Sequence, residues 1–319
     1  MVSFTVNDKE GGKRLEKVFF GRYPRVPAGA FYKALRKRDV KVNGIRTGDA
    51  KTVVGAGDVV SVYIDADALS AQTRISVVYE NDHIILAEKP QGLLSEPDET
   101  RPGEQSLIEA LKDQYELSDP GAREFELCHR LDRNTGGLVF VSKRPDSTDL
   151  IKEALNARYY RKIYSVKVIG DARGILPANG SWKSFTAYIR KSPGESRVFV
   201  TDKAVPGGKQ AETMLRFVSA YSVSGAAGGG NAEVLTVSDL EAMLITGRTH
   251  QIRAHLAFLG FPVAGDGKYG REAENRLTGL KYQALWASRY EFDPEHAAPF
   301  RSISEILPER DFISEPAFR

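Results

Sequence analysis

Apolar residues near the start of the chain show helical spacing in two places. The spacing i, i+3, i+4 occurs once at Leu15, Val18 and Phe19 and once at Phe31, Ala34 and Leu35. This period places the apolar side chains on one face of a helix. We therefore expect two short amphipathic helices, over residues 14–22 and 28–37.

A hairpin signal follows the second helix. In VKVNGIR, residues 40–46, the pair Asn43-Gly44 separates alternating apolar positions, a pattern typical of a tight β-hairpin. The run GDVVSVYI, residues 57–64, predicts a further strand, whereas residues 65–74 lack apolar periodicity. We expect a small α/β N-terminal domain over residues 1–66, a linker over 67–74 and a larger domain over 75–319.

The larger domain alternates strand-like and helix-like segments. The strand-like runs are ISVVYEN, HIILAEKP, FELCH, GLVFVS, KIYSVKVIG, AETMLRFVSAYSV and EVLTVSDLEAMLIT. Helices are expected at SLIEALKDQY, at DSTDLIKEALNARYY with Asp146 or Ser147 as N-cap, and over 246–260 with Thr249 near the N-cap and Gly260 as C-cap. Residues 224–231, SGAAGGGN, predict an exposed flexible turn. The balance of strands and helices favours an α+β domain with a mixed or antiparallel sheet.

Composition excludes several classes of protein. With 319 residues, 41% of them hydrophobic and 27% charged, the chain has an ordinary globular composition. The longest uncharged stretch, residues 217–232, is rich in Gly and Ser, and Asp8 and Glu10 interrupt any signal-like run, so we expect a cytoplasmic protein without membrane segments. One cysteine and five histidines without metal-ligand spacing predict no disulfide and no metal site.

The net charge of +3 conceals an asymmetry. Residues 1–64 carry 13 Lys and Arg against 6 Asp and Glu, a net +7, and residues 65–319 carry 32 against 36, a net −4. A basic module on a slightly acidic body is typical of a protein that holds a polyanion. A basic segment can equally be a solvated surface, so the charge alone does not establish that these residues bind a polyanion.

Two segments concentrate charge beside apolar strands or on a helix. HRLDRNTGG, residues 129–137, places Asp132 between Arg130 and Arg133 in a turn between two strands, which is either a loop ion pair or a functional site. TGRTHQIRAHLAFLG, residues 246–260, is expected to place His250 and Arg253 on one helix face away from the buried stripe. Such groups are usually solvated, but Arg253 can also supply a partner to a buried carboxylate.

These segments resemble known motifs. HRLDRNTGG is similar to the HRLDxxTSG signature of the RluA-type pseudouridine synthases, and KPQGLL, RKIYSVKV and TGRTHQIRAHLAFLGFPVAGDGKYG match further motifs of that family in order. The N-terminal module resembles the S-four-like RNA-binding domain. The resemblance implies a pseudouridine synthase fold, with a mixed, mainly antiparallel sheet flanked by helices, that isomerises uridine in structured RNA without metal or cofactor. Large-subunit ribosomal RNA is the expected substrate, transfer RNA the alternative, and the protein is expected to be a monomer.

The same resemblance assigns three catalytic residues. Asp132 matches the catalytic aspartate, Tyr164 the tyrosine that stacks on the extruded base, and Arg253 the arginine that pairs with the aspartate. Asp132 would stabilise or attack the anomeric carbon, or remove its neighbouring proton. Tyr164 also has a plain alternative, a strand tyrosine packed in the core.

Phosphate contacts are implied for a second set of residues. Arg130 and Arg133 would grip the flanking phosphates, unless Arg130 only braces the loop. In the N-terminal module the expected contacts are Lys33, Arg36, Lys37, Arg38, Lys41 and Arg46.

Two departures and two alternatives accompany the resemblance. Gly136 stands where the family has serine, and YQALWASRYEFDP lacks the histidine–alanine pair that relatives often show. A non-catalytic ribosome-assembly or translation factor is the first alternative, and the intact catalytic residues argue against it. A nucleoside or glycoside hydrolase is the second, and it would need another carboxylate to activate water. His129, His250 and His255 are expected to be structural or to lie near phosphate.

Overall fold

The computed structural model divides the chain into two compact units. One comprises residues 1–75 and 93–123, and the other residues 76–92 and 124–319. The expected limits 1–66 and 75–319 stay predictions, with the addition that residues 93–123 group with the N-terminal unit. Residues 67–72 of the expected linker lie outside the described residues, which are 1–23, 26–64, 73–98, 100–101, 104–116, 125–191, 194–226 and 232–318.

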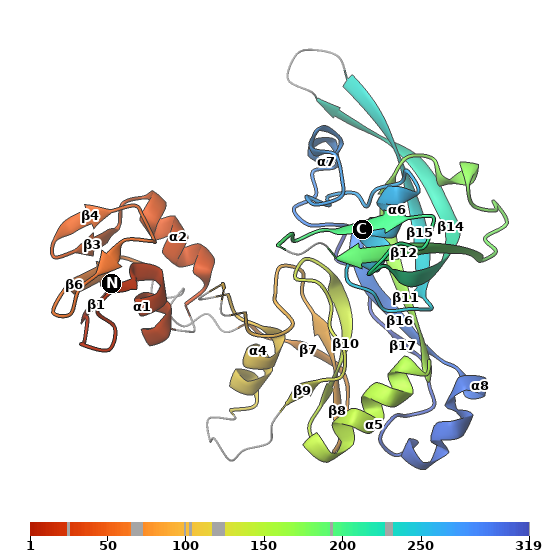
Figure 1. The fold of residues 1–319 in the computed structure, drawn as a ribbon, viewed down its shortest axis with the longest axis horizontal. Helices are drawn as coiled ribbons and strands as arrows, with labels where there is room; N and C mark the ends of the chain where they lie inside the picture. Colours follow the sequence, from red (N-terminus) through yellow and green to blue (C-terminus); the bar gives the residue numbers. More distant parts are fainter. Residues whose placement is uncertain are drawn as a thin grey trace. The chain divides into compact units, whose positions relative to one another are not determined.

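The N-terminal unit has the expected helix pair followed by a hairpin (Figure 1). Helix α1 spans Leu15–Arg22 and α2 spans Ala28–Arg36. The main sheet has the order β1-β6-β3-β4, with β1 Val2–Thr5, β3 Val40–Val42, β4 Ile45–Thr47 and β6 Val59–Val62. A short pair joins β2, Lys13–Arg14, to β5, Val53–Val54.

This unit has its own core. Phe19 and Phe31, from the two helices, are fully buried and stack with their ring centroids 4.4 Å apart. At the tip of the β3–β4 hairpin, Asn43 and Gly44 have φ of 51° and 81°. These are the left-handed conformations that a tight two-residue hairpin turn requires, so the Asn-Gly prediction is confirmed.

The second part of this unit contains helix α4, Leu107–Gln114. Ser106 and Glu109 form a reciprocal capping box at its start, in which each side chain accepts from the backbone of the other. The helix predicted at SLIEALKDQY is therefore confirmed.

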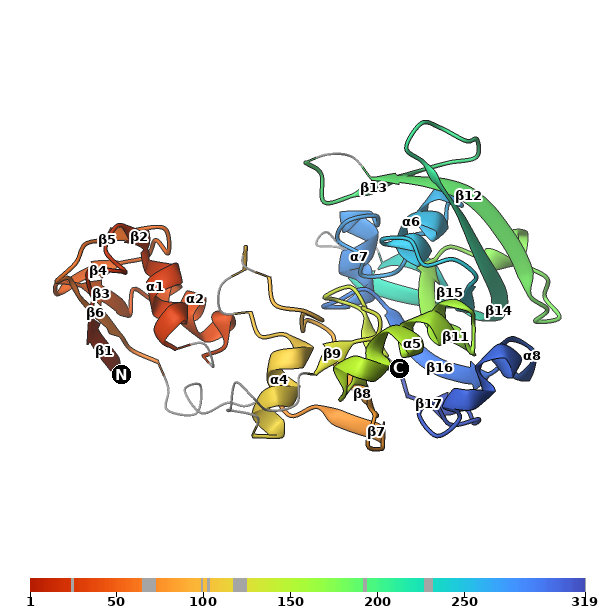
Figure 2. The ribbon, with the colours of Figure 1, turned by 60° about the horizontal axis from the view of Figure 1, so that its bottom comes forward.

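The second unit is built on one large sheet (Figure 2). Its strand order is β13-β12-β14-β15-β11-β16-β10-β8-β7, with β17 beside β16 and β9 beside β10. Only β10 and β16 run parallel among the described strands, as the expected mixed, mainly antiparallel sheet requires. The strands are β7 Ser76–Glu80, β8 Ile84–Lys89, β9 Glu126–Leu127, β10 Gly136–Ser142, β11 Tyr160–Ile169, β12 Lys183–Lys191, β13 Val198–Thr201, β14 Lys209–Ala226, β15 Ala232–Leu244, β16 Leu285–Phe292 and β17 Phe312–Ile313.

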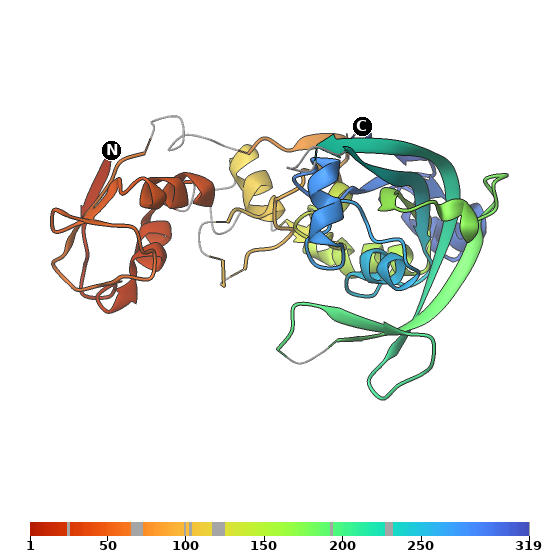
Figure 3. The ribbon, with the colours of Figure 1, turned by 90° about the horizontal axis from the view of Figure 1, so that it is seen from above.

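Helices cover this sheet in two groups. Helix α5, Pro145–Asn156, and α8, Pro294–Ala297, contribute to a core with β8, β10 and β16 around the stacked rings of Phe140 and Tyr290. Helix α6, Gln251–Phe258, instead packs Ala254 against β12, β13 and β14. Helix α7, Glu272–Thr278, lies near α6 in Figures 1 and 3. Short 3₁₀ turns complete the unit at Ala172–Gly174 and Ala298–Ile303.

Three predicted element ends are wrong. Helix α5 has Arg144 as N-cap, because Pro145 takes the first helical position that proline favours. Helix α6 starts at Gln251 with His250 as N-cap, since the Gln251 side chain accepts from the Arg248 backbone N–H and holds the preceding residues in a turn. Residues 224–226 extend β14 instead of forming a turn, and residues 227–231 lie outside the described residues.

No helix in the described part of the chain combines the length and the apolar composition that crossing a bilayer requires.

Candidate active site

The loop between β9 and β10 carries Asp132, whose side chain is 30% exposed. The Thr135 N–H donates to the Asp132 carbonyl at 3.0 Å, which closes the turn. His129 Nε2 accepts from the Phe140 N–H at 3.1 Å, so His129 joins the loop to β10. The loop is therefore held at both ends, and its carboxylate is accessible.

Lys89 anchors the same loop from the end of β8. Its ammonium is buried and donates to the carbonyls of Pro90 and Arg133, each at 3.1 Å. Burial lowers the pKa of Lys89 to about 7, although the charge of Asp132 opposes the shift. Lys89 was not among the expected site residues, although it is the first residue of KPQGLL.

The lowered pKa of Lys89 makes stability depend on pH. Between pH 7 and about 10.5 the unfolded chain retains the Lys89 proton and the folded chain does not, so the free energy of unfolding rises with pH in this window. Below pH 7 the full cost of burying the charge is present. We expect wild type to gain stability relative to Lys89→Met by at most about 1.4 kcal/mol per pH unit across this window. Chemical denaturation at pH 6, 7, 8 and 9 measures the gain, and parallel profiles would contradict the burial of a titrating Lys89.

Arg253 lies between two carboxylates. Its Nη1 donates to Asp132 Oδ2 at 2.7 Å, while its Nε and Nη2 donate to the two oxygens of Asp266 at 2.7 and 2.8 Å. Asp266 has no exposed surface, and its Oδ1 also accepts from the backbone N–H groups of Lys268 and Tyr269. Asp266 therefore fixes the guanidinium that contacts Asp132.

The ion pairs of Arg253 with the two aspartates shift the pKa values of Arg253 and Asp266. Burial alone would lower the pKa of Arg253, but hydrogen bonds to Asp266 and the charges of both aspartates raise it above its ordinary value. Burial likewise opposes ionisation of Asp266, and the Arg253 contact outweighs it, so the pKa of Asp266 is lowered. Arg253 and Asp266 are therefore both charged at neutral pH.

Of the two alternatives for Arg253, a solvated group or the partner of a buried carboxylate, the structure supports the second. Arg253 is only 6% exposed, because the chain returns over α6 after the helix and places Asp266 against it. Asp266 was not among the residues expected at the site. It is the one acidic residue of TGRTHQIRAHLAFLGFPVAGDGKYG, which was a signal available in the sequence.

Tyr164 forms another wall of the site. The pairing of β11 with β16 shifts between Ile163 and Tyr164, because Ser288 is an extra residue on β16. Such a bulge redirects the neighbouring side chain, and Tyr164 lines a pocket together with Asp132, Thr135, Arg248 and His250. Burial, and then the charge of Asp132, raise the pKa of Tyr164 above its usual range, so its ring carries a neutral phenol.

His250 completes the pocket. Its Nε2 lies 3.9 Å from Asp132 Oδ1, and its Nδ1 lies 2.9 Å from the Tyr269 hydroxyl, which accepts from the Val198 N–H. Burial lowers the pKa of His250, so the imidazole is neutral at neutral pH. His250 has a φ of 53°, a conformation uncommon for a residue other than glycine and often found at functional sites. His255 is instead buried beside Thr213, as a structural histidine would be.

The expected phosphate-contacting residues lie in two places. Arg130 is exposed and lines the pocket, and Arg133 is partly buried in the Asp132 loop. The other six belong to the N-terminal unit, on α2, on the turn that follows it and on the β3–β4 hairpin: Lys33, Arg36, Lys37, Arg38, Lys41 and Arg46. Five of these six are exposed, and Lys41 is partly exposed.

Gly136 and Trp286 lie in direct contact on neighbouring strands. They pair on the parallel strands β10 and β16, and a Cβ atom at position 136 would lie 2.1 Å from Cζ3 of the Trp286 ring. Trp286 is 3% exposed and donates from Nε1 to Ser314. The Trp286 ring therefore occupies the space that a side chain at position 136 would need.

We expect Gly136→Ser to lower the free energy of unfolding by about 1–3 kcal/mol through overpacking. In a Trp286→His background the same substitution should cost less, because the smaller ring leaves space for the serine. Thermal denaturation of the two single variants and the double variant measures this coupling. Gly174→Ser, at a position where a Cβ meets nothing within 4 Å, is the matched control. An equal loss of unfolding free energy in both backgrounds would show that the Trp286 ring does not determine the cost of a serine at position 136.

One group of possible metal ligands occurs elsewhere in the described residues. Asp293, Glu295 and His296 place ligand atoms within 4.8 Å of one another. Asp293 already caps α8, accepts from His296 Nδ1 at 3.0 Å and pairs with Arg161 at 3.1 Å. These contacts give the group a structural explanation without an ion.

Comparisons with known proteins identify a family and several relatives. The model of the family described as RNA pseudouridylate synthase matches residues 83–258, which include Asp132, Tyr164 and Arg253. "Ribosomal large subunit pseudouridine synthase C" from Vibrio cholerae is 28% identical and the match covers 90% of this chain and 87% of the relative. "Ribosomal large subunit pseudouridine synthase D" from Xylella fastidiosa is 29% identical, with 95% and 88% covered.

Solved structures support the fold. The human RNA Pseudouridylate Synthase Domain Containing 1 protein aligns with a TM-score of 0.51 at 22% identity, covering 70% of this chain and 80% of that one. The human Domain Containing 4 protein gives the same TM-score at 18% identity, with 76% and 88% covered.

Proposed function

The chain belongs to the RNA pseudouridylate synthase family, and we propose that it isomerises particular uridines of large-subunit ribosomal RNA with Asp132, Arg253 and Tyr164 as its catalytic centre. The observation that carries this assignment is the 2.7 Å contact of Arg253 with Asp132 in a pocket that Tyr164 lines. The names of the relatives from Vibrio cholerae and Xylella fastidiosa support the ribosomal substrate.

The chemistry is an isomerisation. The bond between N1 of uracil and the sugar C1′ breaks, a bond between C5 and C1′ forms, and in the net reaction C5 loses a proton and N1 gains one. Electrons therefore balance without an oxidant or reductant. Asp132 would stabilise the electron-deficient C1′, attack it, or remove the neighbouring proton, while the hydrogen bond from Arg253 orients its carboxylate.

Tyr164 would hold the uracil base while it rotates between the breaking of one bond to C1′ and the formation of the other. Its neutral ring offers a stacking face worth about 1–3 kcal/mol per base. Extruding a nucleotide from a helix costs a few kcal/mol, so stacking offsets much of that cost. Tyr164 lines the pocket that also contains Asp132, which supports this role over a core-packing tyrosine.

A hydrolase would need a second carboxylate to activate water, and the second carboxylate near this site, Asp266, is not available for that role. Asp266 has no exposed surface, and its oxygens accept from Arg253 and two backbone N–H groups. It therefore has no free face from which to activate water, as a hydrolase would require. The paired Asp132 and Arg253 also favour catalysis over a non-catalytic RNA-binding factor.

Incubating the full chain with transcripts of large-subunit ribosomal RNA and of transfer RNA tests the proposal. Pseudouridine is located by carbodiimide modification and primer extension. We propose that product forms in the ribosomal transcript and that the protein acts as a monomer, which light scattering checks. Product in the transfer RNA transcript alone would overturn the assigned substrate.

The cations of α2 should add affinity without adding sequence preference. We expect replacement of Lys33, Arg36 and Lys37 by Gln to weaken RNA binding and to reduce the slope of log K against log salt by about 0.7–0.9 for each phosphate that is no longer neutralised. Fluorescence anisotropy at several salt concentrations measures both quantities. The matched control replaces the exposed Lys9, Lys13 and Lys51, which lie outside α2. An equal change in slope for both triple variants would show nonspecific attraction instead of a binding face.

A further inference from the structure

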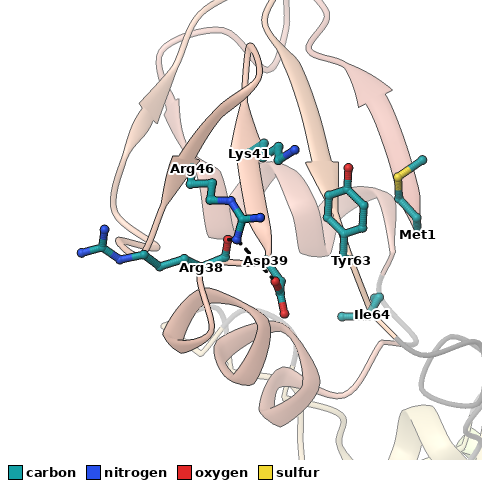
Figure 4. Close-up of a pocket in the computed structure, with 7 residues that line it drawn as sticks. All are labelled: Met1, Arg38, Asp39, Lys41, Arg46, Tyr63 and Ile64. Carbon is teal, nitrogen blue, oxygen red and sulfur yellow. Dashed lines mark hydrogen bonds and ion pairs between the residues drawn. The ribbon is translucent and has the colours of Figure 1, made fainter.

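A pocket of about 430 Å³ opens on the N-terminal unit, where α2 ends and β3, β4 and β6 meet (Figure 4). Its volume lies in the range of sites that hold small organic molecules. Arg38, Lys41 and Arg46 line it together with Tyr63 and Asp39. The pocket therefore combines cations with an aromatic ring and one carboxylate.

Tyr63 provides the flat apolar surface. Tyr63 follows β6 and is 43% exposed. No ring of the described residues stacks on it, and Lys41 Nζ lies 5.4 Å from its ring centroid. The Tyr63 N–H donates to the Asp39 carbonyl at 2.9 Å, which fixes the backbone beneath the ring. An exposed ring on a fixed backbone can serve as a stacking surface for a base.

The cations are held by local contacts. Arg46 Nη1 donates to the Arg38 carbonyl at 3.1 Å and lies 3.9 Å from Asp39 Oδ1. Arg38 has a φ of 57°, which few residues other than glycine adopt. Figure 4 shows Arg46 and Lys41 on one side of the pocket and Tyr63 on the other.

We propose that this pocket binds one unpaired nucleotide of the RNA, with its base stacked on Tyr63 and its phosphate beside Lys41 and Arg46. A nucleotide carries a flat π surface and an anionic group on one small molecule, which matches the two sides of the pocket. Asp39 offers an acceptor for a base N–H or a ribose hydroxyl. A paired base has both faces covered by its neighbours, so the ring selects unpaired nucleotides. This inference rests on the proposed RNA substrate and extends it, because phosphate contacts alone would not require the ring.

The test uses the full chain and two RNA hairpins of equal charge. One ends in a single unpaired uridine and the other in an abasic nucleotide at the same position. We expect wild type to bind the uridine hairpin roughly 5- to 150-fold more tightly by fluorescence anisotropy. Tyr63→Ala should remove the difference, and Tyr63→Phe should keep it. Tyr221→Ala, which truncates a similarly exposed tyrosine on β14, should also keep it.

A measurement on the wild-type protein is independent of any variant's folding. A hairpin with 5-iodouridine at the unpaired position should form a photo-crosslink to the peptide that contains Tyr63. Equal affinity of wild type for the two hairpins, or a preference that survives in Tyr63→Ala, would overturn the proposal. So would uridine monophosphate competing as effectively as the hairpin, since the pocket would then serve a free nucleotide.

Pseudouridine formation in the ribosomal transcript is measured on the same protein. Tyr63-dependent discrimination without any pseudouridine would reject the proposed function and leave the pocket assignment intact. Pseudouridine formation without discrimination between the two hairpins would support the proposed function and reject the pocket assignment.

Discussion

Asp132→Asn should abolish pseudouridine formation while RNA binding is retained. Asparagine keeps the shape of the side chain and an oxygen that accepts from Arg253, but it removes the negative charge that every route at C1′ requires. Loss of a group at the reacting atoms commonly lowers the turnover number by on the order of 10⁴-fold or more. Single-turnover assays on the ribosomal transcript measure the loss, and anisotropy measures the affinity.

The control for this prediction is Asp171→Asn. Asp171 is an exposed carboxylate of the same unit that pairs with Arg173, so its loss should leave the rate unchanged. A rate for Asp132→Asn near that of wild type would reject Asp132 as the catalytic residue. A parallel loss of RNA affinity would instead assign Asp132 to binding.

Arg253→Met should be strongly destabilising. It leaves Asp266 charged, buried and without its cation, a situation that typically costs about 3–5 kcal/mol. Activity should also fall, because Asp132 loses the donor that orients it. Chemical denaturation and the single-turnover assay measure the two effects.

A second variant separates stability from catalysis. In Arg253→Met, Asp266→Asn, the buried charge is gone, while the asparagine oxygen still accepts from the backbone of Lys268 and Tyr269. We expect most of the stability to return and the activity to stay absent. Arg276→Met, on the exposed surface of α7, is the matched control with no expected effect. Recovery of both properties in the double variant would show that Arg253 supports only the fold.

Local patterns predicted most elements because their causes are local. The i, i+3, i+4 spacing of apolar residues defines α1 and α2, and Asn43-Gly44 defines the hairpin through the two positive φ values that these residues tolerate. Helix ends were less predictable. The N-cap of α6 depends on a turn held by the Gln251 side chain, which the spacing of apolar residues does not report.

The sequence by itself determined the types of element, the basic character of residues 1–64 and the residue types of the catalytic centre, because periodicity, charge and short motifs are properties of neighbouring residues. Only the tertiary structure decided that Asp266 holds Arg253, that Lys89 anchors the Asp132 loop and that a bulge at Ser288 accompanies the turn of Tyr164 into the pocket. The same holds for Gly136 and Trp286, which are far apart in the sequence and meet across parallel strands. Each of these contacts joins residues far apart along the chain or depends on strand register, and packing geometry, which no local pattern encodes, determines which side chains meet.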